Sequence, residues 1–255
     1  MELVDTHCHL YSTEFADDRN AMMERTQNAG VVKCFLPAID RNSFQELLKM
    51  ESDFPQACVA MAGLHPCSVK SDYREQLDFF EGFFVARKFA AVGETGLDFY
   101  WDRTFEKEQY LSFNVQIDWA LHYDRPIVIH SRNSIDDTIR TIRERQNGHL
   151  KGIFHCFNET EDAARQIIDL GFYLGIGGVI TYKNSKLPEV IRKIDLKNIL
   201  LETDSPYLPP VPFRGKRNES SYLPFVANTL AVVKGIDPEE VARITTENAL
   251  NIFGS

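Results

Sequence analysis

The feature that most constrains the fold of this chain is an alternation between short apolar runs and longer segments whose apolar residues recur at helical spacing. Eight of the apolar runs predict strands, at residues 3–5, 33–37, 57–62, 90–93, 126–130, 152–155, 172–175 and 198–202. Strands that alternate with helices are typical of parallel βαβ units. Eight successive units predict an α/β fold that closes on itself, the (β/α)8 or TIM barrel.

Two of the intervening helices carry clear signals at their ends. Asn158 followed by Glu161 resembles a capping box, and Gly171 is expected to close the helix that starts there. Asp237 followed by Pro238 predicts the start of a final helix, because aspartate is a preferred cap and proline is tolerated in the first turn.

Length and composition fit a single barrel domain over residues 1–255. The chain has 255 residues, close to the roughly 250 that are typical of a TIM barrel. Its 44% hydrophobic and 25% charged residues are typical of a globular protein with a sizeable core. The formal net charge of −9 argues against nucleic-acid binding through general electrostatic attraction. A local basic rim, or bound cations, could still attract an anionic substrate.

Cysteine usage and hydropathy predict a cytoplasmic protein. The five cysteines form no Cys-x-x-Cys pair, so neither a zinc ribbon nor a disulfide framework is expected. The first predicted strand begins at Leu3, which leaves no room for a signal peptide, and no apolar run reaches the length of a membrane span. We therefore expect reduced thiols, no membrane contact and no obligate protein partner.

Residues that can bind metals gather at the carboxyl ends of the predicted strands, where TIM barrels carry their active sites. Five of the seven histidines follow predicted strands, namely His7, His9, His65, His130 and His155. Histidine is costly in a barrel core unless its polar atoms are satisfied, so chance placement does not explain this pattern. Two carboxylates share the location, Glu94 after the fourth strand and Asp204 after the eighth.

Six of these residues make a set that can hold two divalent cations. Side chains at positions i and i+2 of a strand face the same side, so His7 and His9 can converge on one ion. The expected first site consists of His7, His9, Glu94 and Asp204, because strand eight neighbours strand one in a closed barrel. The expected second site consists of Glu94, His130 and His155, with Glu94 as the bridge. Taken singly, each residue could instead be a hydrogen-bonded core group.

A pair of cations in these sites predicts a particular chemistry. Two cations that share a water lower its pKa and stabilise the oxygens of a phosphoryl displacement. Histidine and carboxylate ligands leave the identity of the metal open among Mg, Mn, Zn and Ni.

Short motifs surround these residues in a fixed order. They read VDTHCHL, GLHP, GETGLDFY, HSR, FHCF and ETDSPYL, followed by Arg214-Gly215-Lys216-Arg217-Asn218-Glu219. Together they resemble the TatD family of metal-dependent deoxyribonucleases, which are amidohydrolase-like TIM barrels. The resemblance extends from residue 3 to the final Thr246-Glu247-Asn248-Ala249 segment, and it implies that the six residues are the metal ligands. One departure is visible: the family pattern usually continues from Asn-Glu to Pro, and this chain has Ser220, in a loop expected at the rim and away from the ligands.

Three residues are expected to take part in catalysis, namely Asp204, His65 and Glu94. Asp204 is the candidate general base, because a carboxylate that touches both metal and water can accept a proton, although it could also be a ligand only. His65 belongs to neither metal set, so it could donate to a phosphate oxygen, protonate the leaving group or have only a structural role. Glu202 lies one strand repeat deeper than Asp204 and is expected to hydrogen-bond a ligand histidine.

Basic and aromatic residues are expected at the rim of the barrel mouth. Arg132, Arg214 and Lys216 are candidates for contacts with substrate phosphates, since guanidinium groups bind phosphate oxygens in a forked geometry. Arg217 adds to this charge, and the alternative for all of them is solvated surface charge. Tyr100, in the aromatic segment 99–101, could stack on a terminal base or pack onto the barrel.

The combined expectation is a metal-dependent hydrolase that cleaves phosphodiester bonds of DNA by means of a water activated by two metals. The family resemblance implies 3′→5′ exonuclease character, with single-stranded DNA ends as the expected substrate. The alternative on the same scaffold is a hydrolase of a small amide, a lactone or a D-aminoacyl-tRNA ester, because fold does not fix function.

Two observations bear on these alternatives. Amidohydrolases with two metals often use a carboxylated lysine as the bridge, and here Glu94 takes that place, which favours the phosphodiesterase. A non-catalytic metal-binding protein is a remote alternative that would leave the six ligands unexplained.

Overall fold

Eight parallel strands alternate with helices along the chain, as the apolar runs predict. The computed structural model describes residues 1–254. The strands are β1 (Leu3–Asp5), β2 (Val31–Leu36), β3 (Cys58–Ala60), β4 (Val92–Asp98), β5 (Ile127–Arg132), β6 (Gly152–Phe154), β7 (Phe172–Ile176) and β8 (Ile199–Leu201). The α-helices are α1 (Arg19–Asn28), α2 (Phe44–Asp53), α3 (Tyr73–Ala86), α4 (Glu106–His122), α5 (Ile135–Arg145), α6 (Glu161–Asp169), α7 (Leu187–Ile191), α8 (Leu223–Lys234) and α9 (Pro238–Phe253). Short 3₁₀ turns occur at η1 (Thr13–Phe15), η2 (Pro66–Ser68), η3 (Gly178–Thr181), η4 (Leu196–Asn198) and η5 (Ser220–Tyr222).

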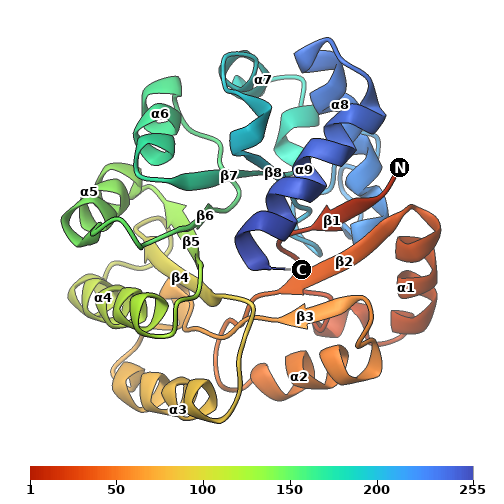
Figure 1. Cartoon of the computed structure of the whole chain (residues 1–255). Helices are drawn as coiled ribbons and strands as arrows, with labels where there is room; N and C mark the ends of the chain where they lie inside the picture. The colour runs from red at the N-terminus through yellow and green to blue at the C-terminus, as the bar shows by residue number, and fades with distance from the viewer. Residues whose placement is uncertain (255) are drawn as a thin grey trace.

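Two links close the strands into a ring. β1–β3 form one hydrogen-bonded sheet and β4–β8 form another, each in sequence order. Ala62 forms a parallel bridge with Val92 of β4, which joins the two sheets on one side. On the other side the Thr6 amide donates to the Leu201 carbonyl oxygen at 3.0 Å, beside β1 and β8. Figure 1 looks into this ring, and the predicted (β/α)8 barrel is confirmed.

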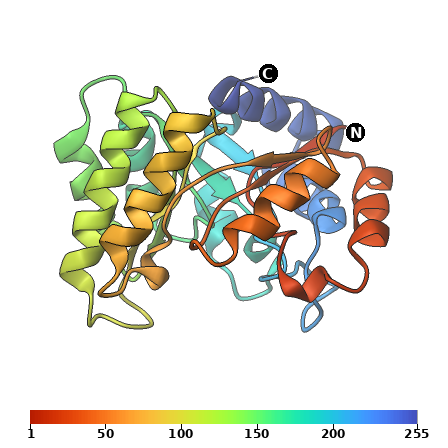
Figure 2. The ribbon, with the colours of Figure 1, turned by 90° about the horizontal axis from the view of Figure 1, so that it is seen from below.

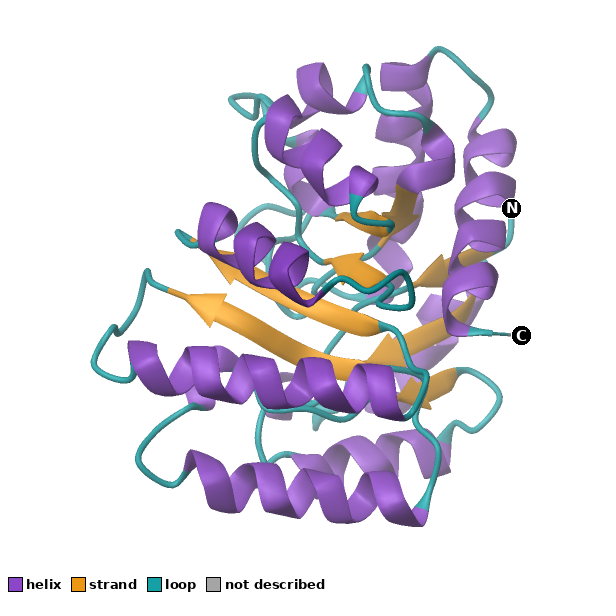
Figure 3. Ribbon diagram, turned by 60° about the vertical axis from the view of Figure 1, so that its left-hand side comes forward, coloured by secondary structure: helices purple, strands orange, loops and turns teal. Residues whose placement is uncertain are grey.

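The helices surround the ring on its outer side, as Figure 3 shows. Their apolar faces pack against the strands in a continuous core, which contains large side chains without any exposed surface: Phe15, Phe44, Phe80, Phe113 and Met22. None of the helices among residues 1–254 is long and apolar enough to cross a membrane.

β4 departs most from its predicted bounds. The sequence predicts a strand over 90–93, whereas β4 spans Val92–Asp98 and carries Glu94 and Asp98 as strand residues. Glycines favour a loop on sequence grounds, but Gly96 lies within β4, where it allows the neighbouring strand to approach closely. A Cβ atom on Gly96 would lie 2.0 Å from the His130 carbonyl oxygen. Glycine inside a strand often marks such an approach of two backbones.

α6 begins later than the capping pattern predicts. Its cap is Thr160, whose Oγ1 accepts a hydrogen bond from the Ala163 amide at 3.2 Å. The prediction of Asn158 as the cap is therefore wrong, because the loop after β6 runs two residues further before the helix starts. Gly171, with a φ of +84°, follows the end of α6 as predicted.

α9 closes the amino end of the barrel. Asp237 caps this helix as predicted, since its Oδ1 accepts from the Glu239 amide at 2.8 Å. Asn248 donates to carbonyl oxygens near the start of β8, and the Phe253 ring stacks on Phe35 of β2 with centroids 3.9 Å apart. Figure 1 shows α9 lying across the ring. Further apolar side chains in or next to the strands join this cluster: Val4, Met61, Val128, Ile153 and Leu200.

Candidate metal centre

The polar strand ends meet at the carboxyl mouth of the barrel, on the side away from α9. In Figure 2 the loops that leave the carboxyl ends of the strands lie along the lower edge, and both chain termini lie at the upper edge. Three groups of residues at this mouth bring possible metal-binding atoms within 4.8 Å of one another: His7, His155 and Asp204; His7, His9 and Glu94; and His65, Glu94 and His130.

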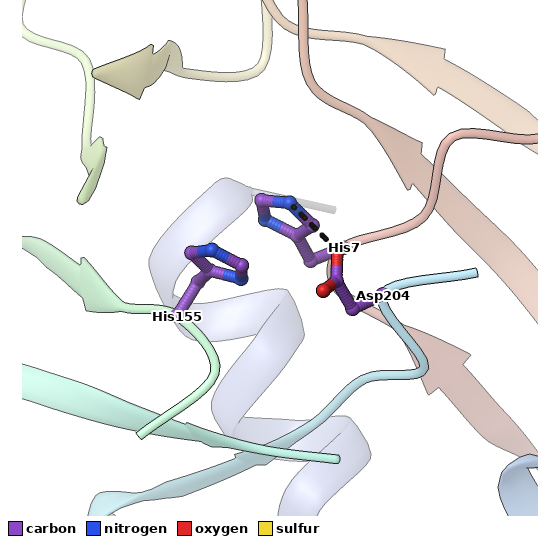
Figure 4. Close-up of side chains that lie close together, drawn as sticks. All are labelled: His7, His155 and Asp204. Atoms are coloured by element: carbon purple, nitrogen blue, oxygen red, sulfur yellow. Dashed lines mark ion pairs between the residues drawn. The ribbon is translucent and has the colours of Figure 1, made fainter. Parts of the chain in front are cut away.

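One oxygen of the Glu94 carboxylate faces the first predicted ligand set. Glu94 Oε2 lies 3.1 Å from His7 Nε2 and 3.7 Å from His9 Nε2. Asp204 Oδ1 lies 3.8 Å from His7 Nε2 and 3.6 Å from His9 Nε2. Figure 4 shows the side chains of His7 and Asp204 facing each other beside His155. The structure therefore brings this predicted set together.

The other oxygen of Glu94 faces the second predicted set. Glu94 Oε1 lies 2.9 Å from His155 Nε2 and 3.0 Å from His130 Nδ1. The carboxylate is buried between the two histidine groups and offers one oxygen to each. A carboxylate in this position can bridge two cations, which is the role that the sequence predicts for Glu94.

Buried nitrogen atoms without hydrogen bonds indicate that the site is built for a ligand. Neither ring nitrogen of His7 has a hydrogen-bond partner among the described residues, although the side chain is completely buried. Leaving a buried polar atom unpaired is costly in a folded protein. An imidazole nitrogen that faces carboxylate oxygens, with no proton shared between them, suits a divalent cation. The residues present therefore fit the metal ions that the sequence implies.

Burial and neighbouring charge act in opposite directions on the two carboxylates. Burial alone would raise the pKa of Glu94, but the positive charge of neighbouring histidines, His155 first, holds this pKa well below its ordinary value. Burial also opposes ionisation of Asp204, and the neighbouring histidines lower its pKa overall. Both groups are therefore anionic at neutral pH and can balance the charge of bound cations.

Tyr11 fixes the orientation of His9, a role that sequence reasoning missed. The Tyr11 hydroxyl donates to the Pro37 carbonyl oxygen at 2.7 Å. Its oxygen is 3.0 Å from His9 Nδ1, so it accepts the proton on that nitrogen. The lone pair of His9 Nε2 is then directed toward Glu94 and Asp204. Tyr11 lies two residues after His9, but that spacing alone does not predict a hydrogen bond.

Asp98 fixes the orientation of His130, and sequence reasoning assigned Asp98 no role. Asp98 Oδ2 lies 2.8 Å from His130 Nε2, while the opposite ring nitrogen faces Glu94. A carboxylate behind a histidine fixes its tautomer and raises its basicity as a ligand. The other oxygen of Asp98 accepts from the amides of Tyr100 and Trp101, which ties the following loop to the centre. The sequence signal for this role is the four-residue spacing between Glu94 and Asp98, which places both side chains on one face of an extended strand.

His65 joins the centre as a hydrogen-bond donor. Its Nδ1 accepts from the Cys67 amide at 3.0 Å, so in the neutral ring the proton is on Nε2. That Nε2 lies 3.4 Å from Glu94 Oε1. A nitrogen that carries a proton cannot bind a cation. His65 lies with Glu94 and His130 in one of the three groups of possible metal-binding atoms, so its exclusion from both metal sets rests on this tautomer and stays a prediction.

Glu202 lies beneath His155, as its depth on the strand predicts. Its Oε1 is 3.5 Å from His155 Nδ1 and accepts a hydrogen bond from the Cys156 amide. The side chain has no exposed surface. Its proposed action on His155 stays a prediction, since the distance is at the outer limit of a hydrogen bond.

Ser220 lies in the interior, so its expected place in a rim loop is wrong. It has no exposed surface, and its Oγ donates to Asp5 Oδ2 at 2.6 Å. Asp5 also accepts from the amide and the hydroxyl of Thr203, at 2.9 and 2.6 Å. Burial raises the pKa of Asp5 to about 6 in spite of these bonds. Ser220 thus belongs to a buried network next to the backbone that carries Asp204.

The predicted rim residues divide into two groups. The Arg132 guanidinium lies over the ring of the exposed Tyr100 at 4.0 Å, and that of Arg214 lies over Tyr182 at 3.9 Å. Lys216 is exposed, with its Nζ 5.9 Å from the centroid of the Phe213 ring. Arg217 differs, because it donates two hydrogen bonds to Asp18, at 2.7 and 2.8 Å. Its charge is therefore balanced within the protein.

Comparisons with known proteins identify the family of this chain. A family model described as TatD related DNase matches residues 4–254. The Bacillus subtilis protein named "Uncharacterized metal-dependent hydrolase YabD" is 37% identical over 254 residues, which cover 98% of each chain. The Escherichia coli protein of the same description, YcfH, is 32% identical over 257 residues and covers 99% of this chain and 96% of its own.

A solved structure supports the same assignment. The crystal structure of YjjV, a TatD homologue from Escherichia coli, superposes with a TM-score of 0.93 at 30% identity. It covers 99% of this chain and 98% of its own. The chain therefore belongs to the TatD-related DNase family and is a metal-dependent hydrolase of that family.

Proposed function

We propose that this hydrolase cleaves phosphodiester bonds of DNA from a 3′ end, with two divalent cations as cofactors. The observation that carries the proposal is the position of Glu94. Its two oxygens face two separate histidine groups, at 3.1 Å from His7 and 2.9 Å from His155. A pair of cations held side by side by a shared carboxylate is the arrangement that phosphodiester hydrolysis uses in many nucleases.

Each cation has its own set of protein atoms in this proposal. One set is His7 Nε2, His9 Nε2, Asp204 and Glu94 Oε2. The other set is His130, His155 and Glu94 Oε1. When bound, the cations (Mg, Mn, Zn or Ni) supply positive charge that lowers the pKa of a water and stabilises a charged phosphoryl group.

Asp204 accepts the proton of the attacking water. It is the more accessible of the two central carboxylates, with 15% of its side chain exposed against 2% for Glu94. Its pKa is lowered, since the effect of burial is outweighed by the neighbouring histidines, so it is ionised and able to take a proton.

His65 donates a hydrogen bond to the reacting group. Its Nδ1 is occupied by the Cys67 amide, which leaves the proton on Nε2 directed into the centre. A donor of this kind stabilises charge that develops on a phosphate oxygen or on the leaving oxygen. Burial lowers the pKa of His65, so the neutral ring is the donor.

Substrate contacts come from the rim. Arg132, Arg214 and Lys216 bind phosphate oxygens, and Tyr100 stacks on a base of the strand end. The Arg132 guanidinium already stacks on Tyr100, which holds both side chains in place for this contact. Because the total charge is −9, attraction of DNA depends on these few residues and on the cations. We therefore infer that single-stranded ends in the cytoplasm are the substrate.

The test follows shortening of end-labelled single-stranded DNA by the purified protein. Reactions contain Mg²⁺ or Mn²⁺, or a chelator, and the label is placed at the 5′ end in one arm and at the 3′ end in another. Glu94→Ala is compared with Glu239→Ala, which removes an exposed carboxylate at the other end of the barrel. We expect stepwise products from the 5′-labelled strand, released mononucleotide from the 3′-labelled strand, and loss of both in chelator and in Glu94→Ala only.

Other outcomes would change the assignment. A protein that holds metal but leaves DNA intact would refute the nuclease proposal, and ester and amide substrates, D-aminoacyl-tRNA among them, would be tested next. Cleavage within the strand would refute the exonuclease mode alone.

A further inference from the structure

A groove beside the metal centre is lined by cationic side chains and, among the described residues, by no carboxylate. It encloses about 660 Å³ between the loops that follow β6, β7 and β8. Its lining includes Asn158, Tyr182, Lys183, Lys186, Val211 and Arg214. All three loops leave carboxyl ends of strands, so the groove opens on the same mouth as the metal centre.

The cationic groups of this groove have no carboxylate partner among the described residues. Within residues 1–254 no carboxylate oxygen lies within 4.0 Å of the side-chain nitrogens of Lys183, Lys186 or Arg214. Some other cations of this chain are balanced, as Arg217 is by Asp18 and Lys193 is by Glu161. A local excess of positive charge in a protein of net charge −9 indicates a site for an anion.

Contacts between two loops hold the groove in shape. The Arg214 guanidinium lies 3.9 Å from the centroid of the Tyr182 ring, and the Tyr182 hydroxyl donates to the Pro209 carbonyl oxygen at 3.1 Å. The Val211 amide donates to Thr181 Oγ1 at 2.9 Å. A groove that is already formed loses little conformational entropy when it binds a ligand.

The groove is continuous in the chain with the metal centre. Asn158 lies three residues after His155, and the loop that reaches Arg214 begins beside Asp204. In the stacked pair, by contrast, Arg132 is the last residue of β5 and Tyr100 follows β4. A bound strand therefore has basic residues on either side of the metal centre.

We propose that this groove is a second phosphate-binding site, which holds the substrate strand at a phosphate other than the one that is cleaved. The proposal rests on the proposed function and adds Lys183 and Lys186 to the substrate contacts. Lysine ammonium groups act as point charges toward phosphate, while the Arg214 fork can bind two oxygens of one phosphate. The groove thus gives the enzyme a preference for oligonucleotides over dinucleotides.

The experiment compares the double variant Lys183→Gln, Lys186→Gln with the wild type. Turnover is measured on a thymidine dinucleotide and on an oligothymidylate of about 12 nucleotides, a length within the usual range of single-strand sites. The matched control is Lys151→Gln, Lys197→Gln, which removes two exposed lysines that precede β6 and β8 at the amino end. A second readout is fluorescence anisotropy of a phosphorothioate oligomer, which resists hydrolysis, with the metal-loaded enzyme.

We expect the groove variant to raise KM for the long oligomer about 5- to 10-fold and to leave kcat and all constants for the dinucleotide unchanged. The slope of log affinity against log salt should fall by about 1.4 if each lysine meets one phosphate of a single strand. The control variant should match the wild type.

Each other outcome decides one of the two proposals. The groove proposal would be overturned if the double variant lost turnover equally on the dinucleotide and the oligomer. It would also be overturned if KM, anisotropy and salt slope did not change. If the wild type binds the oligomer through the two lysines but hydrolyses neither substrate, the groove is supported and the nuclease assignment fails.

Discussion

The two ends of the barrel are made by the same strands and are chemically opposite. At the amino end, α9 covers a cluster of apolar side chains, and Phe253 stacks on Phe35 at 3.9 Å. At the carboxyl mouth, five histidines surround one buried carboxylate, and buried ring nitrogens lack hydrogen bonds. In the segment around β1 the change takes three residues, from Val4 in the apolar cluster to His7 in the metal centre.

The comparison indicates that the two ends of the strands have different roles: the amino end provides stability, and the carboxyl mouth provides the chemistry. Packing at the amino end stabilises the ring, and the ring in turn holds polar side chains in positions that cost stability without a ligand. Changes at the carboxyl mouth should therefore alter activity with little effect on packing. Changes at the amino end should alter stability with little effect on activity.

Glu94→Gln should have the largest effect, at the mouth. It removes the one charge that both ligand sets share, so turnover should fall about 10³-fold or more. Divalent cations that bind the native state raise the melting temperature, and this rise should disappear in the variant. Turnover and thermal unfolding with and without Mn²⁺ measure both effects. Glu239→Gln, at the amino end, is the control, and a full metal-induced rise in Glu94→Gln would contradict the bridging role.

Phe253→Ala should give the largest effect at the closed end. Loss of the buried ring that stacks on Phe35 should lower the free energy of unfolding by about 3 kcal/mol, through lost burial and a cavity. Turnover per folded molecule should stay unchanged. Urea unfolding and active-site titration measure these quantities, with the exposed Leu250→Ala on the same helix as the control. A fall in turnover without a fall in stability would break the separation between the two ends.

Asp98→Asn should give an intermediate effect at the mouth. The carboxylate that accepts from His130 Nε2 at 2.8 Å would be lost, so metal affinity or turnover should fall about 10- to 100-fold. Metal titration by calorimetry measures the affinity. Asp102→Asn, in the exposed part of the following loop, should behave as the wild type. Unchanged metal affinity in Asp98→Asn would mean that His130 does not need this partner.

Arg25→Gln should give the smallest effect and sharpens the comparison, because it tests the ion pairs that Arg25 of α1 makes with Glu219 and Asp18, away from the predicted metal ligands. Arg25 donates to both oxygens of Glu219, at 2.8 and 2.7 Å. Burial opposes ionisation of Glu219, but this hydrogen bonding lowers its pKa overall. A carboxyl whose folded-state pKa lies below its unfolded value stabilises the fold above that unfolded value. This stability is lost as pH falls through the folded-state pKa.

The variant should therefore be about 1 kcal/mol less stable at neutral pH, since the arginine is partly exposed. The difference from the wild type should vanish at low pH. Urea unfolding between about pH 3 and pH 7 follows this change, which covers the range where carboxyl groups titrate. A constant difference across that range would show that Arg25 acts through packing alone.

The strands could be predicted from the sequence because each is an apolar run between helical segments, but the bounds of β4 could not. Gly96 favours a loop when only the chain is read. The reason for Gly96 is a neighbour, the His130 carbonyl oxygen, which leaves no space for a side chain. Such a reason exists only once β4 and β5 are paired.

The convergence of the candidate metal-binding residues could be predicted for a similar reason. Histidines and carboxylates at strand ends converge in any closed barrel, so His7, Glu94 and His155 needed only the fold. The partners that orient them, Tyr11 and Asp98, depend on single hydrogen bonds, and these depend on distances that the fold class does not fix. The basic groove depends on contacts between two loops, which no periodic pattern encodes.

The link that closes the ring has a consequence for the order of folding. Thr6 and Leu201 are hydrogen-bonded although 195 positions separate them in the chain. Closing so long a loop costs entropy before any contact repays it, and contacts of high sequence separation form slowly. His7 and Asp204 lie just beyond these two residues and cannot face each other until β1 and β8 have come together. We therefore expect the metal centre to assemble last. Bound ions would then stabilise the contact between β1 and β8, which the chain alone forms slowly.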